Sequence, residues 1–313
     1  MFNVKKERFG KFVKFKLINS ETREFVSIIP SFGANVNEIV LKKCQLISIL
    51  DGDKTPSDML NNEWFKGAKL SPFPNRIENG RYLFGNKIFR LPINVASENN
   101  AIHGFLYNKV FTLKDLFESK EKASIVLEYK YNEEENGFPF RFILTIAYTL
   151  NSKGLKVETE ILNIGDKKMP IADGWHPHFT FNEQVDDLYL QMPTVEKIIV
   201  NERMIPTGKT EEFENFSQKS IISKTKFDTG FKIKTTGMVK TSLFSKKKNA
   251  TIVLWQEAEK NKYNHLQVFI PPSRKSIAIE PMTSNTNAFN NKDGLIILKP
   301  NEAFSASYSV GLE

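Results

Sequence analysis

In the segment Arg141-Phe-Ile-Leu-Thr-Ile-Ala-Tyr-Thr-Leu150, every second residue is large and apolar. Side chains of a β-strand point alternately to its two faces, so this pattern predicts a strand that buries one face. The same alternation occurs just before it, in Ser124–Tyr131, and just after it, in Leu155–Ile161. The intervening turn Asn151-Ser-Lys-Gly154 is short enough to join antiparallel neighbours, so the three segments predict an antiparallel meander.

This alternation extends over most of the chain. Asn79-Gly80 and Gly85-Asn86 are tight-hairpin signals that flank a short strand at Arg81–Phe84. No long segment repeats apolar residues at the spacing of a helix, so we expect few and short helices. With no internal repeat and no low-complexity linker, the sequence predicts an all-β fold class, one large antiparallel β-sandwich with residues 1–313 as a single domain. Further strands are predicted at Thr251–Trp255, Leu266–Ile270, Ser276–Glu280 and Ser305–Val310.

Composition and charge favour a cytoplasmic protein. No apolar run approaches the ~20 residues that a membrane helix needs, and the start of the chain lacks the apolar stretch of a secretory signal. Cys44 is the only cysteine, which suits a reducing compartment. The formal charge is +8, but the lysines are scattered, and the one tight run, Lys246–Lys248, resembles a hairpin tip. We therefore expect no nucleic-acid or membrane partner, and either a monomer or a homodimer.

The segment Gly174-Trp-His-Pro-His-Phe179 holds two of the four histidines in the chain. Histidine is well suited to passing a proton near neutral pH, which favours an acid/base enzyme. Residues two apart on a strand share a face, so His176 and His178 are expected to point the same way and Trp175 into the core. The histidine pair could instead ligate a metal with a carboxylate from another segment, although no third ligand lies nearby in the sequence. No serine lies in a Gly-x-Ser-x-Gly turn, so a nucleophilic triad is not indicated.

Two loops combine polar side chains with a restricted backbone. The loop Lys69–Ile77 contains two prolines and includes Arg76, whose fork of donors suits the oxygens of hydroxyl groups. In His103-Gly-Phe105, the glycine would let backbone or ligand approach the histidine closely. Each residue also has a structural explanation, since Arg76 could cap strand carbonyls and His103 could be a hydrogen-bonded residue of the fold.

Two carboxylates lie at the ends of predicted strands. Asp228 stands between aromatic residues in Phe227–Phe231, where a role in a turn would also explain it. Glu280 closes the apolar strand that begins at Ser276, and Pro281 follows directly. A carboxylate held in this way is partly desolvated, which raises its pKa and makes it a better base. A rim carboxylate in water is the alternative for Glu280.

Taken together, these segments resemble the aldose 1-epimerase (galactose mutarotase) family. The resemblance follows the order of the family's motifs and covers nearly the whole chain, although each motif is weak alone. It implies a galactose mutarotase-like supersandwich that interconverts the α and β anomers of free aldoses, with no cofactor and no metal. The motifs that carry it are Pro72–Tyr82, His103–Phe105, His176–Phe179, Ile205–Gly208, Phe227–Asp228 and the strand that ends at Glu280.

The resemblance also implies a role for each polar residue. Glu280 would be the base that removes the proton of the anomeric hydroxyl, and His176 the acid that protonates the ring oxygen. The open aldehyde would rotate about its C1–C2 bond and reclose with the two roles reversed. His103 would assist by a hydrogen bond near the ring oxygen, whereas Arg76 and Asp228 would hold sugar hydroxyls through charge-assisted bonds.

One position departs from the family pattern. Many members carry tyrosine two places after the acid histidine, where this chain has His178. Because His178 shares a face with His176, we predict that it contacts the sugar in place of the tyrosine. The departure leaves the preferred sugar open more than it affects the chemistry.

Two other functions compete with this hypothesis. A related branch of the family acts on hexose 6-phosphates, although the Pro-x-Pro-Asn-Arg-Ile loop fits the free-sugar branch better. A carbohydrate-binding or sensing protein without turnover is the second alternative, but it would be expected to lack the base or the acid, and Glu280 and His176 are both present. The basic residues that could bind a phosphate are Lys66, Lys69, Arg76 and Arg81.

Overall fold

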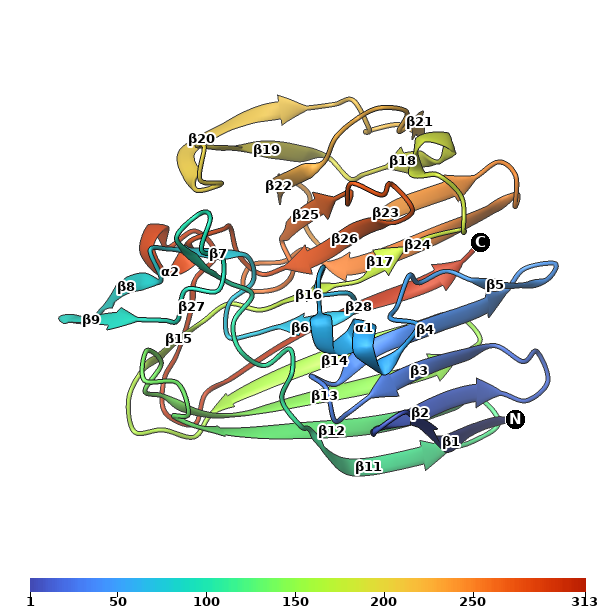
Figure 1. Ribbon diagram of the computed structural model, residues 1–313, viewed down its shortest axis with the longest axis horizontal. Helices are drawn as coiled ribbons and strands as arrows, with labels where there is room; N and C mark the ends of the chain where they lie inside the picture. Colours follow the sequence, from blue (N-terminus) through green and yellow to red (C-terminus); the bar gives the residue numbers. More distant parts are fainter.

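Strands dominate the structure, a computed structural model that describes residues 1–313. The only α-helices are short, α1 at Pro56–Asn61 and α2 at Ala288–Asn291, and a 3-10 turn covers Val185–Asp187. Three large antiparallel sheets account for most of the strands (Figure 1). The predicted all-β class with few short helices is therefore confirmed. No helix is both long enough and apolar enough to cross a membrane.

The predicted meander forms three consecutive strands, β12, β13 and β14, of a nine-stranded sheet. Its strands pair consecutively and antiparallel, and Lys246–Lys248 lies in the turn of another hairpin of the same sheet, as predicted. β28 lies in the middle of the sheet, between β14 and β24. In spatial order the sheet contains β11 (Thr112–Glu118), β12 (Lys122–Asn132), β13 (Arg141–Asn151), β14 (Gly154–Asn163), β28 (Ala303–Leu312), β24 (Ala250–Glu257), β23 (Met238–Ser245), β18 (Tyr189–Gln191) and β21 (Ser220–Ile221).

An eight-stranded sheet carries most of the polar residues singled out in the sequence. Its central strand β26 runs past Glu280 through Pro281 to Met282, two residues further than predicted, because Leu266 and His265 of the neighbouring strand still pair with it. The short strand β17 (His178–Phe179) also pairs with β26. In spatial order the sheet contains β20 (Pro206–Phe213), β19 (Val195–Val200), β22 (Asp228–Ile233), β25 (His265–Phe269), β26 (Ile277–Met282), β16 (Gly174–His176) and β6 (Ala68–Leu70).

The N-terminal part of the chain forms a third sheet of five consecutive strands, shown in blue in Figure 1. It contains β1 (Phe2–Phe9), β2 (Phe12–Asn19), β3 (Phe25–Ile29), β4 (Asn35–Lys42) and β5 (Leu46–Ser48). Three two-stranded pairs complete the fold, and the hairpin predicted around Gly85-Asn86 is one of them. The pairs are β7 (Arg76–Glu78) with β10 (Asn100–Ile102), β8 (Arg81–Phe84) with β9 (Lys87–Arg90), and β15 (Met169–Ile171) with β27 (Ile296–Leu298).

The nine-stranded sheet packs against the other two large sheets. A single cluster of 69 buried apolar residues includes members from all three. Trp175 of the eight-stranded sheet is buried between the layers against Tyr148 and Tyr308, so the prediction that it faces the core is confirmed. Since Trp175 points into the core, its neighbours on β16 point to the opposite face.

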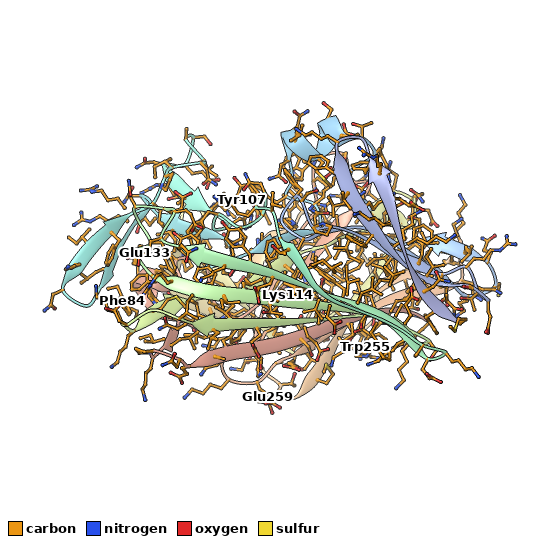
Figure 2. All side chains as sticks on the ribbon, turned by 90° about the horizontal axis from the view of Figure 1, so that it is seen from below. Phe84, Tyr107, Lys114, Glu133, Trp255 and Glu259 are labelled. Atoms are coloured by element: carbon orange, nitrogen blue, oxygen red, sulfur yellow. The ribbon has the colours of Figure 1, made fainter.

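At the outer surface, Lys114 and Glu259 are exposed residues on the side of the molecule that Figure 2 shows.

Candidate active site

Strand register aligns the polar residues across one face of the eight-stranded sheet. Gln267 of β25 pairs with Glu280 of β26. On the other side of β26, Gly174 pairs with Met282 and His178 with Ala278. His176 lies midway between Gly174 and His178, so this register places it beside Glu280. Directly paired residues have side chains on the same face of a sheet, so Gln267, Glu280 and His176 all point away from the core.

The side chains of Glu280 and His176 are in contact on this face of the sheet, and both are buried. Oε1 of Glu280 lies 3.4 Å from Nε2 of His176, and the two residues are 1% and 5% exposed. Oε2 of Glu280 has no hydrogen-bond partner within the protein. Burial raises the pKa of Glu280 well above its usual value, helped by the negative charge of Asp228 and opposed by Arg76. Burial, with a smaller effect of His178, lowers the pKa of His176. Both shifts favour the neutral forms of the pair, with one shared proton.

The raised pKa of Glu280 predicts a pH-dependent stability difference between the wild type and Glu280→Gln. The folded protein keeps the carboxyl proton of Glu280 at pH values above 4.5, the usual pKa of this group. The stability that this protonated form contributes is therefore complete below pH 4.5 and is lost as pH rises through the pKa of the folded state. Glutamine is neutral and does not titrate. We therefore expect the free energy of unfolding of the variant, measured by thermal unfolding, to match that of the wild type near pH 4.5. Above that pH it should exceed the wild-type value by up to about 1.4 kcal/mol for each further pH unit. A difference that stays constant with pH would contradict the burial of an ionisable Glu280.

His103 enters the site on a strained loop beside β10. Its φ of 64° lies in the left-handed region, and its backbone N–H donates to the carbonyl of Asn75 at 2.9 Å. The backbone N–H of Asn75 in turn donates to Nδ1 of His103 at 3.2 Å. The imidazole packs edge-on against His176, with ring centroids 5.1 Å apart. A Cβ on Gly104 would lie 2.1 Å from the carbonyl oxygen of Ser71, so the close approach predicted for this glycine is observed.

Arg76 is held by a carboxylate that the sequence did not single out. Its guanidinium donates through Nε and Nη2 to both oxygens of Glu98, the second bond being 2.9 Å long, and Nη1 donates to Oδ1 of Asn75 at 3.1 Å. The hydrogen bond from Arg76 lowers the pKa of Glu98. Arg203 donates to the Glu98 carbonyl from the other side. The forked contact fixes the plane of the Arg76 guanidinium at the edge of the pocket.

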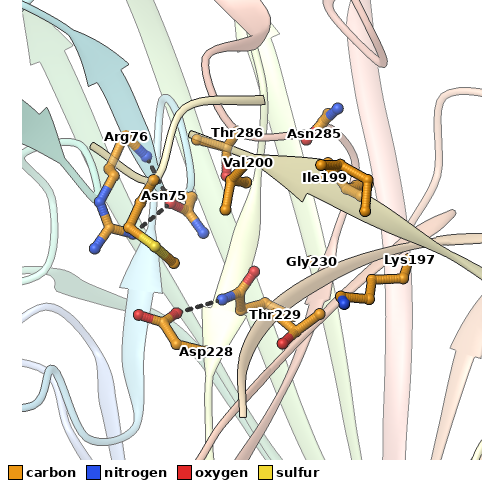
Figure 3. A pocket seen from close by; sticks show the side chains of 13 residues that line it. Asn75, Arg76, Lys197, Ile199, Val200, Asp228, Thr229, Gly230, Asn285 and Thr286 are labelled. Carbon is orange, nitrogen blue, oxygen red and sulfur yellow. Dashed lines mark hydrogen bonds between the residues drawn. The ribbon is translucent and has the colours of Figure 1, made fainter. Parts of the chain in front are cut away.

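A pocket of about 240 Å³ lies beside the buried pair, since Gln267, the strand partner of Glu280, lines it. Arg76 and Asp228 both line it (Figure 3), and Asp228 accepts a hydrogen bond from Nε2 of Gln267 at 2.7 Å. The wall includes backbone and side chains of β19 and the loop after β26. Its lining residues are Asn75, Arg76, Lys197–Val200, Met204, Asp228–Gly230, Gln267, Asn285 and Thr286.

His178 lies behind His176, away from this pocket. Its side chain is completely buried, and its Nε2 lies 3.0 Å from Nδ1 of His176. The two rings are nearly parallel, with an interplanar angle of 13° and centroids 4.9 Å apart. Nδ1 of His178 lies 3.4 Å from Oγ of Ser276. Contact between His178 and a sugar stays a prediction, since its hydrogen-bond partners here belong to the protein.

Lys69 lies on the opposite face of the same sheet. It is fully buried, and its ammonium donates to Asp173, to Oγ1 of Thr159 at 3.3 Å and to the Gly174 carbonyl at 3.4 Å. It also lies 4.4 Å from the ring centroid of Trp175. Burial lowers the pKa of Lys69 to about 8, which Asp173 opposes. The hypothesis that Lys69 helps to bind a phosphate is therefore wrong, because the sheet separates this ammonium from the pocket.

The sequence profile described as Aldose 1-epimerase matches residues 16–311. The chain belongs to the aldose 1-epimerase family. Among curated relatives, the "Uncharacterized protein YihR" of Escherichia coli is 29% identical over 293 residues, with 91% of this chain and 90% of the relative covered. The bifunctional protein GAL10 of Kluyveromyces lactis is 26% identical over 194 residues, which are 59% of this chain and 28% of that protein.

Solved structures of this family share the fold over the full length. A galactose mutarotase-like protein from Clostridium acetobutylicum has a TM-score of 0.88 at 25% identity, with 100% of this chain and 98% of that chain covered. Galactose 1-epimerase from Lactobacillus acidophilus has a TM-score of 0.82 at 18% identity, with 100% and 98% covered. The predicted family and the predicted galactose mutarotase-like fold are thus confirmed.

In this aldose 1-epimerase fold, the predicted site residues come together while several of their partners were missed. Arg76 and Asp228 line the pocket, whereas Glu280, His176 and His103 form a row of contacts beside it that ends at the lining residue Asn75. No cluster of three His, Cys, Asp or Glu side chains is arranged as a metal site. The alternation of its strand indicates that Gln267 shares a face with His265 and Phe269. Only the pairing of Gln267 with Glu280 shows that it belongs to the site. The missed residues are Gln267, Glu98, Asn75, Lys197, Met204, Asn285 and Thr286.

Proposed function

We propose that this protein is an aldose 1-epimerase that interconverts the α and β anomers of a free aldohexose by acid/base ring opening and reclosure. The observation that carries the proposal is the contact of 3.4 Å between Oε1 of Glu280 and Nε2 of His176, beside a polar pocket that the strand partner of Glu280, Gln267, lines. The two oxygens that exchange protons in this reaction are bonded to the same sugar carbon. A carboxylate and an imidazole this close together can reach both of them.

The pair can provide the base and the acid together. Moving the shared proton from Glu280 to Nε2 of His176 yields a carboxylate and an imidazolium. The carboxylate takes the proton of the anomeric hydroxyl as the C1–ring oxygen bond breaks, and the imidazolium protonates the ring oxygen. After rotation about C1–C2, Glu280 returns its proton to the aldehyde oxygen while His176 removes the proton from the attacking hydroxyl. Each turnover therefore leaves both residues as they began.

The remaining pocket residues suit the binding of a ring of hydroxyl groups. Arg76 offers donors, Asp228 offers acceptors, and the amide of Gln267 donates to Asp228 and holds its carboxylate in place. His103 lies against His176, and because its Nδ1 accepts from the Asn75 N–H, its Nε2 would be the nitrogen that donates near the ring oxygen. Such convergent polar groups in a concave site fix the orientation of a small ligand.

The hexose 6-phosphate alternative is weakened by the pairing of the basic residues. Lys66 is bonded to Asp51 at 2.9 Å, Lys69 is buried against Asp173, and Arg76 is held by Glu98. Lys197 lines the pocket but forms an ion pair with Glu211 at 2.8 Å. A phosphate would have to compete with a carboxylate for each of these cations. A binding protein without turnover is disfavoured because Glu280 and His176, the residues proposed as base and acid, are both present and in contact.

The test is polarimetry of freshly dissolved α-D-glucose and α-D-galactose, with the two hexose 6-phosphates measured alongside. We expect the protein to speed the approach to anomeric equilibrium of at least one free sugar above the buffer rate, and to act less well on the phosphates. Acceleration restricted to the 6-phosphates would move the protein to that branch. Binding of a free sugar without any acceleration would establish the non-catalytic alternative instead.

A further inference from the structure

A row of hydrogen-bonding groups leads away from the acid His176 on the side opposite Glu280. Nδ1 of His176 contacts Nε2 of His178 at 3.0 Å, and Nδ1 of His178 contacts Oγ of Ser276 at 3.4 Å. The Ser276 hydroxyl donates to Oδ2 of Asp51 at 3.0 Å. His178 and Ser276 are 0% and 1% exposed, so these contacts are shielded from water. The row therefore connects the acid to a carboxylate from a distant loop.

The protein backbone holds the far end of this row in place. The backbone N–H of Asp51 donates to the carbonyl of His178 at 2.8 Å, and the neighbouring residue Leu50 forms a bridge to Phe179. Lys66 pairs with the Asp51 carboxylate at 2.9 Å. Asp51 is thus fixed both by its backbone and by its side chain. A carboxylate held at this point orients the donors that precede it.

The groups around His178 keep its imidazole neutral. Burial, with a contribution from the nearby Lys66 ammonium, lowers the pKa of His178 to about 3, and the Trp64 carbonyl opposes this effect. The other side of His178 packs against the Phe269 ring, with centroids 6.2 Å apart. A neutral imidazole has one N–H donor and one acceptor nitrogen, so His178 can donate in only one direction.

The Asp51 carboxylate sets that direction. Because Asp51 can only accept, Ser276 donates to it, and the Ser276 oxygen is left to accept from Nδ1–H of His178. Nε2 of His178 is then an acceptor, and Nδ1–H of His176 donates a hydrogen bond to it. This leaves Nε2 of His176, the atom that faces Glu280, as the nitrogen that gains and loses the catalytic proton.

We propose that His178 is a positioning residue that, oriented by Ser276 and Asp51, holds His176 with its proton on Nδ1 and its Nε2 directed at the sugar. The inference rests on the proposed function for its kinetic consequences, but its structural content concerns the protein alone. Mutarotation needs no net proton uptake or release, so the row orients the acid and stabilises its imidazolium rather than conducting protons to solvent. In the sugar-free protein, the contact that His178 makes is with the acid His176.

The first test is the nitrogen resonance spectrum of the imidazoles in the sugar-free protein. The chain has only four histidines, so the signals that disappear in His176→Asn identify His176, and those that disappear in His178→Phe identify His178. We expect Nδ1 of His176 to be the protonated nitrogen in the wild type, and the proton to be shared between its two nitrogens in His178→Phe. Protonation of Nε2 alone in the neutral wild-type ring would overturn the proposal, whether or not the protein proves to be a mutarotase.

The second test compares His178→Phe, which removes the acceptor, with His178→Gln, which keeps an amide oxygen within reach of His176. We expect His178→Phe to lower kcat by about 10- to 100-fold with KM little changed, since a misaligned acid group costs rate more than binding. His178→Gln should recover most of the loss. The basic limb of the kcat–pH profile should move to lower pH in His178→Phe, because the imidazolium of His176 loses its acceptor.

Ser276→Ala provides a milder variant should His178→Phe fail to fold. It should shift the basic limb in the same direction with a smaller loss of kcat. Ser245→Ala is its matched control, because Ser245 is also buried and donates to a carboxylate, that of Glu183, at 2.9 Å, yet lines no part of the pocket. Equal effects of the two serine variants, or an increase in KM with kcat unchanged in the His178 variants, would overturn the positioning role.

Discussion

Glu280→Gln is expected to reduce the acceleration of mutarotation by about 10²–10⁴-fold, because an amide cannot take the proton of the anomeric hydroxyl. The loss should fall on kcat, since glutamine keeps the shape of glutamate and its carbonyl oxygen can still accept a hydrogen bond from the sugar. The Glu280 side chain has one oxygen 3.4 Å from His176 and another without a protein partner, so no ion pair of the fold is broken. The measurement is polarimetry over a range of sugar concentrations.

The control for this experiment is Glu38→Gln. Glu38 is a half-buried carboxylate of the N-terminal sheet that accepts hydrogen bonds from Lys14 and Ser27, away from the pocket. It should retain the wild-type rate. If Glu280→Gln kept more than about a tenth of the wild-type kcat, another group would have to be the base, because general bases contribute more than this.

Lys69→Met is expected to destabilise the fold by about 3–5 kcal/mol, since it leaves the Asp173 carboxylate buried without its cation. Asp173 then keeps only the hydroxyl of Tyr263, at 2.9 Å, on one oxygen, while its other oxygen has no partner. With an unfolding entropy of about 2 cal/mol/K per residue, the melting temperature should fall by roughly 5–8 °C. Calorimetry or the circular dichroism melt gives this value directly.

Two further variants separate the buried pair from a general effect of losing a lysine. Lys69→Met combined with Asp173→Asn should regain part of the lost stability, because the uncompensated charge is removed. Lys156→Met breaks an exposed pair with Glu158 and should cost less than about 1 kcal/mol. A loss for Lys69→Met no larger than for Lys156→Met would mean that the buried pair does not stabilise the fold.

Strands with one buried face and one solvent-exposed face were predicted well from the sequence. In β13 the burial alternates residue by residue as the sequence implies, and β12 and β14 follow suit. Central strands carried less information about their neighbours. β26 is buried on both faces, so nothing in Ile277–Met282 indicates that Gln267 lies opposite Glu280 or that His176 lies on the other side.

The candidate site was predictable residue by residue only through the family resemblance. Arg76, His103 and Asp228 each had a structural explanation when taken alone, and the structure gives two of them structural partners as well, Glu98 for Arg76 and Asn75 for His103. Glu98 and Asp51 carry no motif, because their importance lies in what the fold places beside them. For His178, the alternation of side chains along a strand correctly implied that it shares a face with His176. The direction of the side chain alone does not show that its Nε2 contacts Nδ1 of His176.

The central place of β28 has a consequence for the synthesis of the chain. β11 to β14 are complete once residue 163 has been made, yet the strand that pairs with β14 begins at residue 303. At ribosomal speeds of about 5–20 residues per second, the meander waits on the order of ten seconds with an unpaired edge. An open edge of this kind can capture another strand, so nascent chains on a crowded messenger are most vulnerable to misassembly during this interval.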